Sequence, residues 1–180
     1  MLHKFRTYYF IDKLDREEIV KLNSDINIIL RNYKIKFNAK DIKKIIKLCH
    51  SKRQKIFIAN DFKMAFKYNF DGVYLPSFNK INNFKNLPMK KSFKIIGSAH
   101  NLREIIVKIN QGCNEIFISP IFKTYKDNYL NIIKFNILNL LNPKTIIALG
   151  GLNEKNFKKI QMTKSKGFAS ISWIKKTGLQ

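Results

Sequence analysis

Acidic residues are scarce in this sequence of 180 residues: 12 aspartates and glutamates stand against 35 lysines and arginines, a formal net charge of +23. Such an excess is typical of proteins with an anionic partner, for example nucleic acid, phosphate or a membrane surface. The lysines are dispersed along the chain, however, and no RNP, KH, zinc-finger or homeodomain pattern accompanies them. Nucleic acid is therefore not the expected partner, and net charge alone supports it as an alternative.

Cysteine and long apolar runs are also lacking. Cys49 and Cys113 are too few for a disulfide framework, and no C-x-x-C or His/Cys cluster indicates zinc, so both are expected to be small buried residues. No apolar run reaches the ~18–20 residues that span a bilayer. The N-terminal residues show no secretory h-region or small-residue cleavage site. We expect no membrane partner and a cytoplasmic location.

What the sequence does contain is a series of short, mostly continuous apolar runs, which is typical of parallel strands buried on both faces. These runs are 7–12, 26–31, 55–60, 72–75, 94–100, 115–122, 145–150 and 167–174. Helical periodicity and capping residues predict helices between most of them. The predicted helices are 41–51, 61–68, 101–111, 130–141 and 153–161.

Strand and helix alternate with a spacing of roughly twenty residues, which indicates α/β units. Eight strands predict a small, closed (β/α)8 TIM barrel that forms a single domain over 1–180, with a doubly wound open sheet as the alternative. The fourth helix is expected to be weak or absent, because 77–93 is rich in Asn and contains Pro88. The last helix is expected to be truncated, and an apolar flank left uncovered there could be buried in a homodimer.

In such a barrel the reacting groups lie in the loops after the strands. Gly150 and Gly151 follow the seventh strand and lead to Asn153, a candidate N-cap, while Ser170, Ile171 and Ser172 follow the eighth. Two glycines before a helix let backbone N–H groups approach an anion closely, so this pattern predicts a phosphate cradle. An ordinary Gly–Gly turn is the alternative.

Polar residues also follow the other strands, and each has a plain structural alternative. Asp61 could hold Mg²⁺ or simply N-cap the next helix, while the neighbouring Asn60 could bond a phosphate oxygen. Arg31 could make a bidentate phosphate contact or lie on the surface. Ser98 and Thr124 are candidate phosphate or heterocycle contacts, and His100 is a candidate acid/base group, although local hydrogen bonds would explain all three.

Six strand-end motifs, in register, resemble the thiamine phosphate synthase/TenI family. They read Asn60-Asp61, Asp71-Gly72-Val73, Gly97-Ser98-Ala99-His100, Ser119-Pro120-Ile121-Phe122, Gly150-Gly151 and Gly167-Phe168-Ala169-Ser170-Ile171-Ser172. The resemblance implies a barrel that joins hydroxymethylpyrimidine diphosphate to thiazole phosphate with Mg²⁺ and releases pyrophosphate.

The resemblance also assigns roles to residues. It implies that Arg31, Asn60 and Ser98 contact the pyrimidine diphosphate and that Asp61 holds Mg²⁺. On the thiazole side it implies contacts to the phosphate region and its cradle from Thr124, Gly150, Gly151, Ile171 and Ser172. Lys126 takes the place of the family's pyrophosphate lysine if one residue is deleted from the loop after the sixth strand. Arg31, Ser98 and Thr124 are the residues assigned to catalysis.

Several positions depart from the family pattern. Asn79 stands where the family has a second metal-binding Asp, Tyr74 where it has a His, and Lys34 lies one residue away from the family's lysine. Pro120 occupies the position at which the TenI-type tautomerase uses a His. These departures leave two readings open: a diverged synthase, and a non-catalytic barrel that binds a thiazole or pyrimidine phosphate.

Overall fold

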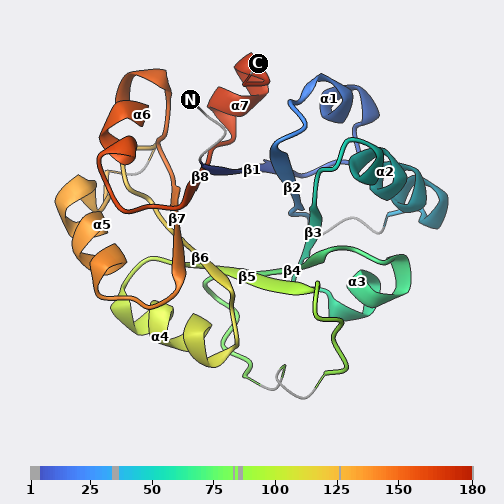
Figure 1. Cartoon of the computed structure of the whole chain (residues 1–180), viewed down its shortest axis with the longest axis horizontal. Coiled ribbons are helices and arrows are strands. Elements are labelled where there is room, and N and C mark those ends of the chain that lie inside the picture. The colour runs from blue at the N-terminus through green and yellow to red at the C-terminus, as the bar shows by residue number, and fades with distance from the viewer. Residues whose placement is uncertain (1–4, 34–36, 83, 85–86, 126, 180) are drawn as a thin grey trace.

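A computed structural model describes residues 5–33, 37–82, 84, 87–125 and 127–179, and over this part of the chain eight parallel strands form a closed barrel (Figure 1). Each strand pairs with its neighbours in sequence, and β8 closes the ring on β1. The strands are β1 (Arg6–Ile11), β2 (Ile26–Leu30), β3 (Ile56–Ala59), β4 (Gly72–Leu75), β5 (Lys94–Ala99), β6 (Glu115–Ile118), β7 (Thr145–Leu149) and β8 (Gly167–Ala169). The predicted closed barrel is confirmed, and the open-sheet alternative is wrong.

Helices surround the ring of strands (Figure 1). They are α1 (Arg16–Lys21), α2 (Ala39–Ser51), α3 (Phe62–Tyr68), α4 (Leu102–Asn110), α5 (Asn131–Leu140), α6 (Glu154–Gln161) and α7 (Ser172–Thr177). The five predicted helices are present. As expected, the described residues between β4 and β5 contain no helix.

The ends of two predicted strands are wrong, and each error has a local cause. The predicted run 115–122 is a strand only to Ile118, because Pro120 has no N–H to donate to a ladder. The predicted run 167–174 is a strand only to Ala169, because the backbone turns at Ile171 into α7. That six-residue helix is the truncated last helix that the sequence predicted.

Aromatic side chains fill the inside of the barrel. Tyr8 lies edge-on to Phe117 with ring centroids 4.9 Å apart, and Phe10 lies edge-on to Tyr74 at 5.3 Å. The other buried members of this inner cluster are Ile29, Phe57, Ala59, Ile96, Ile147 and Ala169. Because the interior is packed, we expect a ligand of the barrel to bind at its mouth, where the strands end, and not inside it.

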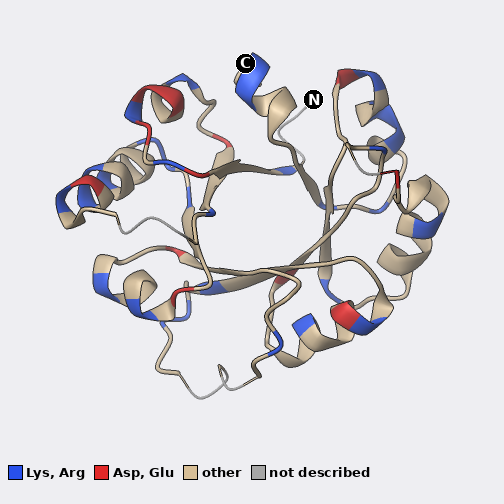
Figure 2. Ribbon diagram, turned by 180° about the vertical axis from the view of Figure 1, so that it is seen from behind, with Lys and Arg blue, Asp and Glu red and all other residues tan. Residues whose placement is uncertain are grey.

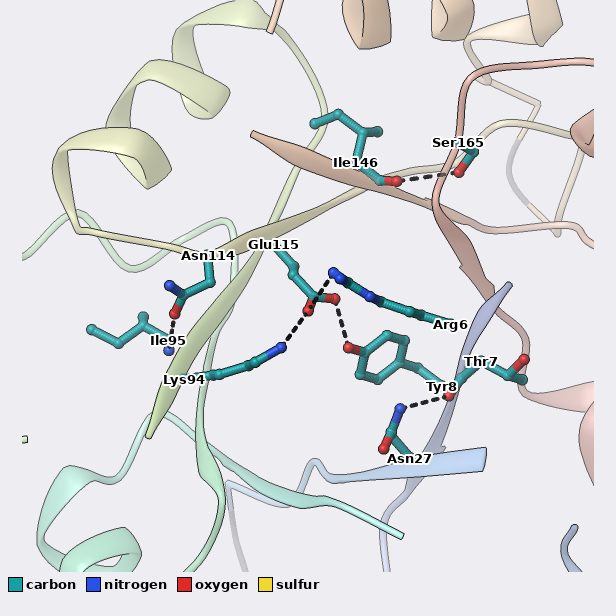
Figure 3. Close-up of polar contacts among 10 residues, drawn as sticks. All are labelled: Arg6, Thr7, Tyr8, Asn27, Lys94, Ile95, Asn114, Glu115, Ile146 and Ser165. Atoms are coloured by element: carbon teal, nitrogen blue, oxygen red, sulfur yellow. Dashed lines mark hydrogen bonds and ion pairs between the residues drawn. The ribbon is translucent and has the colours of Figure 1, made fainter. Parts of the chain in front are cut away.

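The opposite end of the barrel is closed by a polar cluster around the buried Glu115, the first residue of β6 (Figure 3). Its carboxylate accepts hydrogen bonds from the Tyr8 hydroxyl at 2.6 Å, Arg6 at 3.0 Å and Lys94 at 3.1 Å. Burial, together with the nearby Glu115, raises the pKa of Tyr8 and keeps its hydroxyl a donor. The cluster joins the N-terminal ends of β1, β5 and β6.

The apolar flank expected beside the last helix is covered within the chain. Trp173 of α7 stacks on Phe168 with centroids 5.6 Å apart and packs against Phe157 at 5.3 Å. Exposed apolar side chains gather instead along α5 and just beyond α6. They are Ile133, Ile137, Leu140, Leu141 and Met162. The homodimer stays a prediction.

Two further expectations concern the cysteines and membranes. Cys49 and Cys113 are both free and fully buried, as predicted. Within the described ranges, no helix is long and apolar enough to cross a bilayer.

Candidate functional site

The loops after β6, β7 and β8 enclose a pocket of about 450 Å³ at the mouth of the barrel. Five residues that the sequence predicted to bind phosphate line this one pocket: Thr124, Gly150, Gly151, Ile171 and Ser172. The structure therefore brings together residues from three loops that lie up to 48 positions apart in the sequence.

The two glycines of this pocket are required by the backbone. Gly150 has φ of +93° and Gly151 has φ of +70°, a region that L side chains rarely adopt. A Cβ on Gly151 would lie 2.6 Å from the carbonyl oxygen of Phe122 and 2.7 Å from that of Lys123. Glycine thus allows the loops after β6 and β7 to meet along one wall of the pocket.

The start of α6 lies directly behind the glycines. Asn153 caps this helix by accepting from the Asn156 N–H, and the Asn156 side chain accepts from the Asn153 N–H in return. The Asn156 amide also donates to the Gly151 carbonyl at 2.8 Å. The helix start and the Gly–Gly turn therefore form one unit, which directs the positive end of the helix dipole toward the pocket.

The hydroxyls of the β8 loop have different roles. Ser170 is buried and donates to the Leu152 carbonyl at 3.1 Å, so it holds the two loops together. Ser172 is exposed at the start of α7 and lines the pocket.

Sequence reasoning missed Lys123, whose side chain also lines the pocket. Its Nζ lies 2.7 Å from Asp127 Oδ1, and both side chains are largely exposed. The signal that could have found it is its place in the loop after the sixth strand, next to Thr124. Lys126, predicted to contact pyrophosphate, lies outside the described residues, as does Lys34.

The other half of the mouth contains Arg31, Asn60, Asp61 and Ser98. The guanidinium of Arg31 lies over the Phe10 ring, 5.0 Å from its centroid, and Arg31 Nε is 3.6 Å from Asp12 Oδ1. Because Phe10 belongs to the inner cluster, Arg31 lies above the packed interior, with about a third of its side chain exposed. A cation is thus present where the sequence predicted a phosphate contact.

Ser98 is buried, and its Oγ accepts a hydrogen bond from the Tyr74 hydroxyl at 2.8 Å. Burial raises the pKa of Tyr74 to about 12, so this hydroxyl keeps its proton at neutral pH. His100 is bonded at both ring nitrogens, with Nδ1 2.6 Å from the Ser119 carbonyl oxygen and Nε2 3.1 Å from Ser77 Oγ. These contacts support the structural role of His100 rather than an acid/base role.

Asp61 has the capping role that was its structural alternative. Its Oδ1 accepts from the Met64 N–H at 2.8 Å at the start of α3. The preceding Asn60 has φ of +60°, and its Oδ1 accepts from the Asn79 amide at 2.5 Å. The capping bond leaves Asp61 a second carboxylate oxygen.

The residues at this half of the mouth do not fit a magnesium site with two protein ligands. Asn79 Oδ1 already accepts from the Ile81 N–H at 2.9 Å and from the Gln111 amide at 3.2 Å. Its other polar atom is the NH2 group that faces Asn60. In the part of the chain that the structure describes, no group of three His, Cys, Asp or Glu side chains could hold a metal ion. Asp61 offers one carboxylate here, and Asp12 offers another beside Arg31.

Comparison with known proteins identifies the relatives of this chain. The thiamine-phosphate synthase of Prochlorococcus marinus is 33% identical over 144 residues, which cover 74% of this chain and 40% of the relative. That of Staphylococcus haemolyticus is 28% identical over 136 residues, covering 72% of this chain and 63% of the relative. The chain therefore spans less than two thirds of the length of these relatives.

Solved structures show the same fold. The thiamine phosphate pyrophosphorylase of Pyrococcus furiosus superposes with a TM-score of 0.72 at 16% identity, over 97% of this chain and 92% of that one. The enzyme of the same name from Bacteroides thetaiotaomicron gives 0.64 at 19% identity, over 94% and 84%. The family model TMP-TENI, described as thiamine monophosphate synthase, matches residues 27–174. The chain belongs to the thiamine monophosphate synthase family.

Proposed function

We propose that this protein is a diverged thiamine phosphate synthase, which joins hydroxymethylpyrimidine diphosphate to thiazole phosphate. The observation that carries the proposal is the pocket after β6, β7 and β8, where Gly150, Gly151 and Ser172 surround a space large enough for a phosphate group. Family membership supplies the substrates, since the curated relatives are thiamine-phosphate synthases.

The reaction needs charge neutralisation and alignment more than acid/base groups. The bond between the pyrimidine methylene carbon and the diphosphate oxygen breaks, and its electron pair leaves with pyrophosphate. The thiazole nitrogen then donates its lone pair to that carbon. We assign charge neutralisation to Arg31, contacts with the diphosphate to Asn60 and Ser98, and alignment of the thiazole phosphate to the Gly151 and Thr124 side of the mouth.

The proposal gives magnesium one protein carboxylate as a ligand in place of two. A bound Mg²⁺ would supply charge to the leaving pyrophosphate, and the Asp61 carboxylate is the group that we propose to hold it. Because Asn79 offers no free carbonyl oxygen, we expect weak Mg²⁺ binding.

The second candidate is a non-catalytic barrel that binds a thiazole or pyrimidine phosphate. It is favoured by Asn79, whose amide is committed to hydrogen bonds within the protein. In this case the pocket for the monophosphate is retained, and the half of the mouth that would bind the diphosphate no longer supports the reaction.

A basic nucleic-acid-binding barrel receives less support. Lys and Arg are spread over the helices all around the ring and do not gather on one side of it (Figure 2). A homodimer and a cytoplasmic location also stay predictions. Sedimentation of the purified protein tests the dimer, and localisation of the tagged chain in its own cell tests the compartment.

Calorimetric titration separates the first two candidates. The protein is titrated with thiazole phosphate, then with hydroxymethylpyrimidine diphosphate and Mg²⁺, and the mixture is assayed for thiamine phosphate. Binding of both ligands with product supports the synthase. Binding of the monophosphate without product supports the non-catalytic barrel, and failure of both ligands to bind would overturn both proposals.

A further inference from the structure

Lys108, on the inner face of α4, is fully buried although it carries an ammonium group. Its Nζ donates to the Pro76 carbonyl at 2.7 Å, to the Asn79 carbonyl at 3.0 Å and to Gln111 Oε1 at 2.8 Å. All three acceptors are neutral, and no carboxylate pairs with this lysine among the residues described. Burial of an unpaired charge is costly, so a lysine here calls for an explanation beyond packing.

The space for this side chain is provided by a glycine of β5. A Cβ at Gly97 would lie 2.9 Å from Lys108 Cδ and 3.0 Å from Cys113 Sγ. The Cys113 thiol is itself buried, which raises its pKa to about 12, so it supplies no negative charge at neutral pH. The lysine therefore reaches past β5 to the chain that leaves β4.

In that segment, between β4 and β5, the described residues form no helix. Contacts with α3 and with α4 and its C-terminal end hold the described residues between β4 and β5. Farther along the segment, Phe84 stacks on Phe62 of α3 with ring centroids 4.4 Å apart. At its start, Lys108 and Gln111 bond Pro76, Asn79 and Ile81. The α4 residues thus do the anchoring that a helix after β4 would otherwise do.

The anchored segment reaches the mouth through Asn79. The Ile81 N–H is an unambiguous donor, so it fixes Oδ1 of Asn79 on its own side and directs the NH2 group toward Asn60. Asn60 directly precedes Asp61, whose carboxylate caps α3. A continuous chain of hydrogen bonds therefore leads from the buried lysine to the diphosphate half of the mouth.

We propose that Lys108 is a positioning residue, which holds the Asn79–Asn60 pair so that this half of the mouth presents N–H donors to a diphosphate where the family uses a second carboxylate. The identity of the ligand rests on the proposed function, whereas the anchoring of the loop does not. The class of ligand is an inorganic or organic pyrophosphate, bound with a weak requirement for Mg²⁺.

The test compares Lys108→Met with Lys80→Met. Methionine keeps an unbranched side chain out to Cε and removes the ammonium. Lys80 is an exposed lysine of the segment between β4 and β5 and serves as the matched loss of charge. Calorimetry with inorganic pyrophosphate, in saturating inorganic phosphate, reports on the diphosphate half. Calorimetry with inorganic phosphate alone reports on the Gly–Gly pocket.

We expect Lys108→Met to lower pyrophosphate affinity by about tenfold, which corresponds to the loss of one charge-assisted hydrogen bond. Its phosphate affinity should stay within about twofold of the wild-type value. Lys80→Met should change both affinities by similar, small factors. Equal loss of both ligands in Lys108→Met, or no loss of either, would overturn the proposal.

Hydrogen exchange provides a readout that needs no ligand. The Asn79 and Ile81 amides, bonded to Pro76 O and Asn79 Oδ1, should exchange at least about tenfold faster in Lys108→Met, with the strand amides unchanged. Unchanged exchange at these amides would contradict the anchoring. If neither ligand binds the wild-type protein but exchange rises as expected, the proposed function fails and the anchoring stands.

If Lys108→Met does not fold, Asn79→Ala takes its place. This variant keeps the lysine contacts to the backbone carbonyls of Pro76 and Asn79. It removes the link to Asn60, together with the bonds that Asn79 Oδ1 accepts from Ile81 and Gln111. It should show the same selective loss of pyrophosphate. If Asn79→Ala binds pyrophosphate as tightly as the wild type, the Asn79 side chain does not connect Lys108 to the diphosphate half of the mouth.

Discussion

At the scale of single residues, Gly151 is the position where a substitution should damage the pocket most directly. In Gly151→Ala the new Cβ meets two backbone carbonyls at 2.6 and 2.7 Å and also sits at a positive φ. The loops must separate, so we expect phosphate affinity to fall by about tenfold or more, as contacts from backbone N–H groups are lost. Calorimetry with inorganic phosphate on the folded variant measures this loss.

Gly112 provides the matched control. It has φ of +81°, but a Cβ there would meet nothing within 4 Å. Gly112→Ala should therefore cost only the backbone strain of about 1 kcal/mol in the free energy of unfolding, with phosphate affinity unchanged. Equal phosphate affinities in the two alanine variants would show that the Gly–Gly turn does not shape a phosphate site.

Lys108 also predicts how stability depends on pH. Burial lowers the pKa of Lys108 to about 8, below its ordinary value of 10.5. Between these values the unfolded chain binds more protons than the folded one, so the contribution of Lys108 to the free energy of unfolding rises with pH, by up to about 3 kcal/mol. This contribution is complete above pH 10.5 and disappears as the pH falls through 8.

Urea unfolding of the wild type and of Lys108→Met, at several pH values from neutral to alkaline, isolates this effect from other titrating groups. The difference in stability, wild type minus variant, should increase with pH over this window. A difference that stays flat or decreases would mean that the ammonium is not penalised by burial.

At the scale of elements, the sequence predicted the order of the eight strands and the identity of five helices, because continuous apolar runs and capped amphipathic segments are local signals. It missed α1, whose six residues bury only Ile19 and so show no periodicity. It extended the last strand into α7, since Ile171, Trp173 and Ile174 continue its apolar pattern. Such boundaries are set by tertiary contacts, here the packing of Trp173 on Phe168.

The sequence predicted the candidate site only in part. The five predicted residues that line the pocket after β6, β7 and β8 follow from the rule that loops after parallel strands meet at one end of a barrel. The Lys108–Gln111–Asn79 network was not predictable, because a lysine one turn from the end of a helix is ordinarily a surface residue. The described residues between β4 and β5 form no helix, and two of their backbone carbonyls accept hydrogen bonds from this lysine in the interior.

The polar cluster around Glu115, at the end of the barrel opposite the pocket, leads to a prediction about stability. In Glu115→Gln, Tyr8, Arg6 and Lys94 lose a common anionic acceptor, and an amide NH2 faces at least one donor. We expect the free energy of unfolding to fall by about 2–4 kcal/mol, measured by urea denaturation. Since the cluster lies at the far end of the barrel, phosphate affinity of the folded variant should be unchanged.

Glu17→Gln is the control, because Glu17 is exposed on α1 and its loss of charge should cost only a few tenths of a kcal/mol. If both variants lose the same stability, general charge and not the cluster around Glu115 is responsible.

At the scale of the whole molecule, a net charge of +23 spread around the barrel is a source of repulsion within the folded state. In Figure 2 basic residues lie on helices on every side of the ring, so this repulsion is general. Salt screens exposed charges over a Debye length of about 10 Å at 0.1 M. Buried ion pairs are screened less, so the Glu115 cluster should be little weakened by salt. Stability should therefore rise with salt, in contrast to a protein held by surface ion pairs.

The measurement is the urea midpoint in sodium chloride from about 20 to about 500 mM, a range over which the Debye length falls severalfold. Chloride is used because we propose that the Gly–Gly pocket binds phosphate, and sulfate or phosphate salts would add binding to screening. The midpoint should increase, and should do so equally in Gly151→Ala, since the effect belongs to the whole surface and not to the pocket. A midpoint that falls with salt would mean that exposed pairs such as Lys123–Asp127 outweigh the repulsion among the lysines.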